Sequence, residues 1–138
     1  MTTKKKSTQS SRKRSTRAAM LVATNERRPT KDRVTAFAEA PLAVCETDQN
    51  LQAVLAVVRD QKEPVEVRMA AMDSLAAAAF SAIAFAPCRN DYIATLREVA
   101  TDPNPQIRET ALGTLAGEKD GFVQKKLLEG LKNPGKAL

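Results

Sequence analysis

Lysine and arginine side chains near the N-terminus have the clearest potential for chemistry in this sequence. They form two basic clusters, KKK at residues 4–6 and RKR at residues 12–14, and Arg17 and the pair Arg27–Arg28 follow. The candidate contacts to a polyanion are Lys4, Lys5, Lys6, Arg12, Lys13, Arg14, Arg17, Arg27 and Arg28. Side chains of this kind neutralise phosphates and release counterions, and they do so without recognising individual bases.

Charge is concentrated in this part of the chain. Residues 1–33 carry 11 Lys and Arg against two acidic residues, a net charge of +9, whereas the other 105 residues carry −3. We predict that residues 1–29 are a disordered basic arm, because Ser, Thr, Lys and Arg bury too little apolar surface to offset the entropy of ordering. The arm has no aromatic residue on which bases could stack. The alternatives are a solvated tail, a nuclear-import-like signal or an organelle transit peptide.

The residue types needed for catalysis are missing. The chain contains no histidine, which removes the commonest general base and a usual zinc ligand. It also has no Gly-rich phosphate loop, nucleophile elbow or paired-carboxylate motif. Cys45 and Cys88 lack CxxC spacing, and we expect them to be thiols in a reducing compartment, the cytoplasm, nucleus or nucleoid. We therefore expect no catalytic residue, no cofactor and no metal site.

From Thr30 onward, composition and spacing predict an all-α fold. In LQAVLAVVRD the apolar residues recur at i, i+3, i+4 and i+7, which places them on one face of a helix. Helix start signals occur at Thr30, at Thr47 with Asp48, at Asn90 or Asp91, and at Asn104 with Pro105. We expect one long Ala-rich helix from residue 65 to Pro87. No apolar stretch approaches 18 residues, so no membrane-spanning helix is expected.

Several expected helices repeat their pattern about 40 residues later. Val67, Arg68, Ala71 and Leu75 match Ile107, Arg108, Ala111 and Leu115 at an offset of 40. In the preceding helices, Leu51, Leu55 and Val58 match Tyr92, Leu96 and Val99 at an offset of 41, and Asp60 matches Asp102 at an offset of 42. Self-similarity near this period, with two helices per unit, is typical of helical solenoids. We predict units at about 48–86 and 90–117 and a partial unit at 120–138, in a repeat domain that covers residues 30–138.

With these residues the sequence resembles the HEAT family, and its short HEAT-like repeats most closely, over about residues 48–138. The resemblance implies a short right-handed α-solenoid whose second helices line a concave surface that holds other proteins. It also implies a hydrogen-bonded ladder between the Asp and Arg side chains of successive repeats, here Asp60, Arg68, Asp102 and Arg108. The sequence departs from the family pattern in two ways. The turn at 60–68 is longer than usual, and the third unit stops where its second helix should begin, so that either this helix is absent or the chain is the front portion of a longer protein.

The arm and the resemblance together give an expected function. We expect a non-catalytic protein-interaction scaffold whose arm adds electrostatic contact with DNA, RNA or another polyanion. The alternative is a nucleic-acid-binding protein in which the arm is the main site and the repeats are its support. The surface candidates for a protein partner are Glu66, Arg68, Asp73, Glu109 and Thr110.

Overall fold

The structure is a computed structural model, and it describes residues 17–39, 41–80 and 82–117. These residues contain helices and turns but no strand, so the predicted all-α class is confirmed for them. The chain divides into two compact units, residues 1–88 and 89–138. The basic clusters and the predicted partial unit at 120–138 lie outside the described residues.

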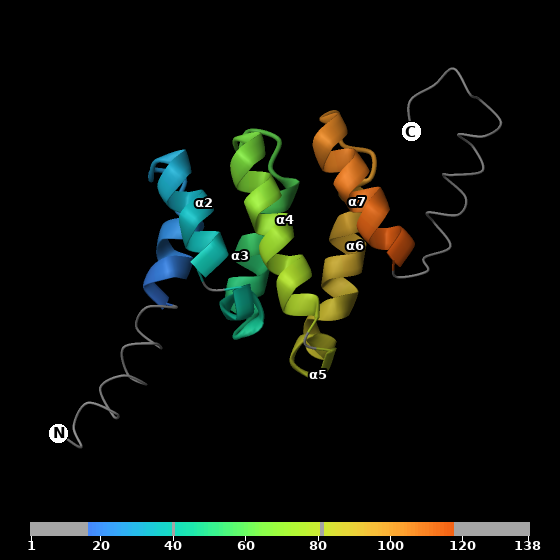
Figure 1. Cartoon of the computed structure of the whole chain (residues 1–138), viewed down its shortest axis with the longest axis horizontal. Coiled ribbons are helices and arrows are strands. Elements are labelled where there is room, and N and C mark those ends of the chain that lie inside the picture. Colours follow the sequence, from blue (N-terminus) through green and yellow to red (C-terminus); the bar gives the residue numbers. More distant parts are fainter. Residues whose placement is uncertain (1–16, 40, 81, 118–138) are drawn as a thin grey trace. The chain divides into compact units, whose positions relative to one another are not determined.

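The first unit is built around its longest helix. Residues 17–23 are helical, and α2 (Thr30–Glu39), the 3₁₀ helix η1 (Pro41–Cys45), α3 (Asp48–Arg59) and α4 (Val65–Ala79) follow. Two short elements, α5 (Ala82–Phe85) and η2 (Ala86–Cys88), complete the unit. Helix α4 packs against α2, α3 and η1, and Figure 1 shows α2 and α4 lying side by side. The predicted start of α3 is confirmed, because the Thr47 side chain accepts a hydrogen bond from the Asn50 amide.

The core of this unit combines a few large side chains with many alanines. Phe37, Leu51, Leu55 and Leu75 are almost fully buried, and they are the bulk of the core. Ala71 lies among the buried residues of α4 with no exposed surface. Small residues at such positions allow helix backbones to approach closely, and this explains why a sequence with few aromatic residues can still form a packed core.

Residues 17–23 are helical where the sequence analysis placed part of a disordered arm. Ala19, Met20 and Ala23 are buried, whereas Leu21 is 72% exposed, so one face of this short helix is covered. A helix of seven residues is not stable in isolation, since nucleation costs more than so few hydrogen bonds return. The sequence pattern AAMLVAT is too short to show the packing that stabilises it.

Helix α4 is shorter than predicted. It ends at Ala79, and the Phe80 amide donates to the carbonyl oxygens of Ala77 and Ala78, which tightens the last turn. The last buried residue of α4 is Ala78, while Phe80 is 91% exposed. The helix therefore stops where its buried face stops, at the end of the alanine run 76–79.

The second unit consists, in its described part, of α6 (Arg89–Val99) packed against α7 (Pro105–Gly117). Its core contains Tyr92, Leu96, Val99, Ile107, Ala111 and Leu115. The prediction that Asn90 or Asp91 caps α6 is wrong, because η2 leads directly into α6 and the helix begins at Arg89. None of the helices described in either unit is long and apolar enough to cross a membrane.

The predicted cap of α7 is confirmed, and its contribution to stability can be measured. Asn104 Oδ1 accepts hydrogen bonds from the Gln106 and Ile107 amides at 2.9 and 3.1 Å. We expect Asn104→Ala to lower the free energy of unfolding by about 1 kcal/mol, because these amides lose their acceptor. The exposed Asn90 lies inside the first turn of α6, so Asn90→Ala is the matched control and should change stability by less than about 0.5 kcal/mol. Urea titration followed by circular dichroism measures both, and equal losses would contradict the cap.

Candidate functional site

The two arginines predicted to form a ladder occupy the same position in their helices. Arg68 and Arg108 are each the fourth residue of a second helix, α4 and α7. Arg68 Nε and Nη2 donate to the Val58 carbonyl oxygen, near the end of α3, at 2.9 and 2.7 Å. Arg108 Nη1 donates to the Asp102 carbonyl oxygen at 3.0 Å. Each guanidinium thus provides a donor for a backbone carbonyl at the end of the preceding helix or in the turn after it, which has no partner within that helix. The dipole of the preceding helix also favours a positive charge at this end.

The two predicted ladder aspartates form turns. Asp60 Oδ1 accepts from the Lys62 amide at 2.9 Å, and Asp102 Oδ2 accepts from the Asn104 amide at 2.9 Å. A carboxylate that binds the amide two residues later forms an Asx turn, which reverses the chain between two helices. The structure thus gives all four predicted residues a place in a helix–turn–helix pair. The ladder between successive repeats remains a prediction.

A third arginine, which the sequence pattern does not predict, occupies the same position again. Arg33 is the fourth residue of α2, and its Nε donates to the Ala23 carbonyl oxygen at 3.0 Å. The spacing of ten residues equals that between Arg68 and Val58. Both arginines are only 2% exposed. The segment 17–39 is therefore a helix pair with the same internal contact as the pair formed by α3 and α4.

The turns of these two pairs are also alike, at an offset of 35 residues. Asn25 Oδ1 accepts from the Arg27 amide at 3.0 Å, as Asp60 Oδ1 accepts from the Lys62 amide. The Arg28 amide donates to the Asn25 carbonyl oxygen at 3.0 Å, and the Glu63 amide donates to that of Asp60 at 3.1 Å.

The buried faces of the two pairs follow the same offset. Ala19, Met20 and Ala23 correspond to Val54, Leu55 and Val58, and all six are buried. TNERRP at 24–29 and RDQKEP at 59–64 share their final proline and an Asn or Asp at the second position. This weak pattern was the available sequence signal. Its period of 35 differs from the period near 40 that relates the later units, so it does not stand out as part of the same repeat.

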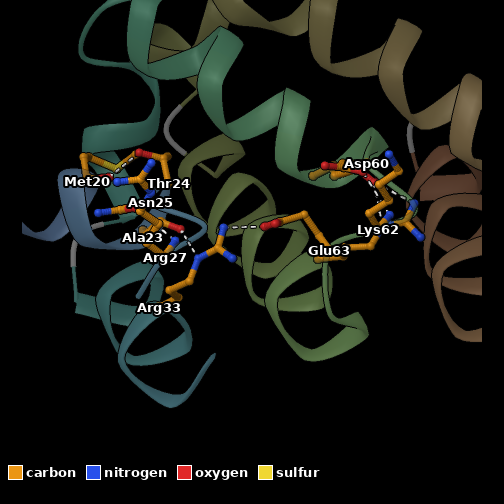
Figure 2. Close-up of polar contacts among 11 residues, drawn as sticks. Met20, Ala23, Thr24, Asn25, Arg27, Arg33, Asp60, Lys62 and Glu63 are labelled. Atoms are coloured by element: carbon orange, nitrogen blue, oxygen red, sulfur yellow. Dashed lines mark hydrogen bonds and ion pairs between the residues drawn. The ribbon is translucent and has the colours of Figure 1, made fainter. Parts of the chain in front are cut away.

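An ion pair joins the first helix pair to the turn of the second. Arg33 Nη2 binds Glu63 Oε2, and their side chains are only 3% and 9% exposed. Figure 2 shows the Arg33 guanidinium between Ala23 on one side and Glu63 on the other. The carboxylate that bridges neighbouring pairs here is thus Glu63, three residues after the Asp60 named from the resemblance. A single guanidinium holds both its own pair and the next one.

The structure places three of the predicted polyanion contacts in the folded unit. Arg17 lies in the first helix, while Arg27 and Arg28 lie in the turn that precedes α2, and all three are exposed. Arg28 forms a solvent-exposed ion pair with Asp32 at 3.9 Å. These arginines therefore occupy set positions on helices and turns. The other six, which form the basic clusters, lie outside the described residues.

A surface groove of about 430 Å³ lies above the buried ion pair. Its lining includes the acidic residues Glu26, Asp60 and Glu63 together with Arg27 and Arg33. Charges of both signs are interspersed there, which favours neither an anion nor a cation. Within the described residues, no three Cys, Asp or Glu side chains converge as a metal site.

Comparison with known proteins adds no assignment to this geometry. Neither a family model, nor a curated protein, nor a solved structure matches the chain.

The Arg33–Glu63 pair yields a stability prediction. We expect Arg33→Met to lower the free energy of unfolding by about 3–5 kcal/mol, because it leaves the Glu63 carboxylate buried without a counter-charge. The double variant Arg33→Met with Glu63→Leu should recover most of this loss, since neither charge then remains. Urea denaturation gives these values. If Arg33→Met does not fold, the milder Glu63→Gln provides the comparison.

The exposed pair Arg28–Asp32 is the matched control. Both side chains are 49% exposed, so Arg28→Ala should cost less than about 1 kcal/mol. A loss at Arg33 no larger than the loss at Arg28 would show that the buried pair does not hold the two helix pairs together.

Proposed function

We propose that this protein is a non-catalytic protein-interaction scaffold of HEAT-like helix pairs, and that its basic clusters add electrostatic contact with nucleic acid or another polyanion. The observation that carries the proposal is the recurrence of one pair design in α2, α4 and α7, where the arginine at the fourth position of the second helix donates to a backbone carbonyl of the preceding helix or turn. Chains built from such units present an extended surface on which other proteins bind.

The partner surface in this proposal is the exposed side of the second helices. Glu66 and Asp73 on α4 and Glu109 on α7 are exposed, as a contact surface requires. Arg68, which was also a surface candidate, is buried and has a structural role. The proposed arrangement is a short right-handed α-solenoid in which the pair at 17–39 is an additional repeat.

The alternative function is nucleic-acid binding, with the N-terminal segment as the main site. It is favoured by the density of positive charge, since residues 1–17 contain seven Lys and Arg and no acidic residue. Binding of this kind follows the phosphate backbone without base selectivity.

A salt titration tests the role of the basic clusters. Removal of residues 1–28 would also delete a packed helix, so the test uses the full chain with Lys4, Lys5, Lys6, Arg12, Lys13 and Arg14 changed to Gln. If the six side chains neutralise six phosphates of a single-stranded oligonucleotide, the slope of log K against log salt should be about −4 for the wild type. The slope should be much shallower for the variant. Fluorescence anisotropy at several salt concentrations measures both. Lys31→Gln with Lys62→Gln, two exposed lysines of the folded unit outside the candidate contacts, is the control. Equal slopes for all three proteins would contradict the proposed contact.

The same six-residue variant separates the two functions. Cross-linking of wild type and variant in a cell extract, followed by mass spectrometry, identifies protein partners of each. The scaffold predicts partners that persist in the variant and are lost when Glu66 and Asp73 are both changed to Lys. Loss of every partner in the six-residue variant would favour the alternative.

A further inference from the structure

A small, mostly apolar groove lies between α2 and α4. It has a volume of about 180 Å³, which suits one side chain rather than a whole ligand. Its apolar lining consists of Val34, Phe37, Ala38, Pro41, Ala70 and Ala77, and its polar lining of Ser74 and Asp73. Asp73 is the one charged residue that lines the groove. The groove is therefore a mostly apolar slot with one carboxylate.

The surrounding surface of α4 is acidic. Glu66, Ala70, Asp73 and Ala77 follow one another at helical spacing, so they lie along one stripe of α4. Glu66 and Asp73 are exposed, whereas the basic residue of this helix, Arg68, is buried against the Val58 carbonyl. Among the described residues, Asp73 forms no ion pair. This stripe thus offers negative charge that no described basic residue neutralises.

We propose that the basic clusters of the same chain dock in this groove, with one Lys or Arg side chain inserted so that its charged end meets Asp73. The methylene stem of such a side chain can cover the apolar walls of the slot, while its charged head stays with the Asp73 carboxylate or with water. Charge complementarity supports this occupant, because residues 1–17 carry seven basic residues and no acidic one.

The chain is long enough for this contact. The 16 residues that precede the first described helix span up to roughly 50 Å when extended. That helix lies against α2 through the hydrogen bond between Arg33 and Ala23, and the width of a helix is only about 10–12 Å.

Docking would regulate the proposed contact with polyanions. The inference depends on the proposed function in this respect, because a side chain inserted in the groove cannot bind phosphate at the same time. A polyanion and the groove would then compete for the same side chains, and occupancy of the groove would lower the apparent affinity for the polyanion.

Nuclear magnetic resonance of the full chain tests docking without any polyanion. Backbone amide shifts are compared between the wild type and the full-length variant with six Gln substitutions in the basic clusters. We expect differences at residues 34, 38, 70, 73 and 77, and we expect high salt to remove them. Asp73→Asn and the charge-neutral Ala77→Leu, which fills the slot, should also abolish the differences. Ala94→Leu on the exposed side of α6 is the control and should preserve them.

Two results would overturn the inference. One is identical groove shifts in the wild type and the six-residue variant. The other is a difference that vanishes on dilution, which would assign the groove to the N-terminal segment of a second copy.

An oligonucleotide titration separates this inference from the proposed function. If docking competes with phosphate, Ala77→Leu should bind a single-stranded oligonucleotide several-fold more tightly than the wild type at low salt, and Ala94→Leu should not. Equal affinities for these variants would contradict the competition. A wild-type chain that binds no oligonucleotide would overturn the polyanion contact, while the amide shifts would still decide whether the basic clusters dock.

Discussion

A buried guanidinium that binds a backbone carbonyl at the end of the preceding helix is the contact on which the first two helix pairs depend. Arg33 and Arg68 are both 2% exposed and both reach back ten residues, to Ala23 and Val58. Burial of such a charge is costly unless it is hydrogen-bonded and compensated. The hydrogen bond therefore forms only if the turn and the direction of the second helix place its fourth residue next to that carbonyl. This requirement makes each pair one structural unit.

This constraint explains how a short chain with few aromatic residues forms repeated units. The Asx turns at Asn25, Asp60 and Asp102 reverse the chain, and a buried apolar stripe then closes each pair. In the first unit, Arg33 also binds Glu63, so the polar contact within one pair extends to the turn of the next. The exposed sides of α2 and α4 are left free by these contacts. The proposed functions place binding on those sides and on the basic clusters.

The sequence allowed much of this architecture to be predicted. The apolar spacing located α2, α3, α6 and α7, and Thr47 and Asn104 are caps as expected. The helix at 17–23 was not predictable from its own residues, because its stability comes from packing and from the bond between Arg33 and Ala23. The end of α4 at Ala79 is not predictable for a similar reason, since the alanine-rich sequence on both sides favours continuation of the helix. The pairing of Arg33 with Glu63 required the relative placement of two helix pairs, which sequence spacing does not give.

Native-state hydrogen exchange tests the central claim, that residues 17–39 form a helix pair of the same kind as α3 with α4. The amides of Ala23 and Thr24, which close the first helix, are the most informative. The account predicts that they open with a free energy within about 1 kcal/mol of that for the amides of Arg33 in α2 and Met72 in α4, because one cooperative unit contains them all. If the Ala23 and Thr24 amides exchange at the rate of an unfolded chain while the amides of α4 are protected, the account is contradicted. Residues 17–23 would then belong to a disordered basic arm, as the sequence predicts.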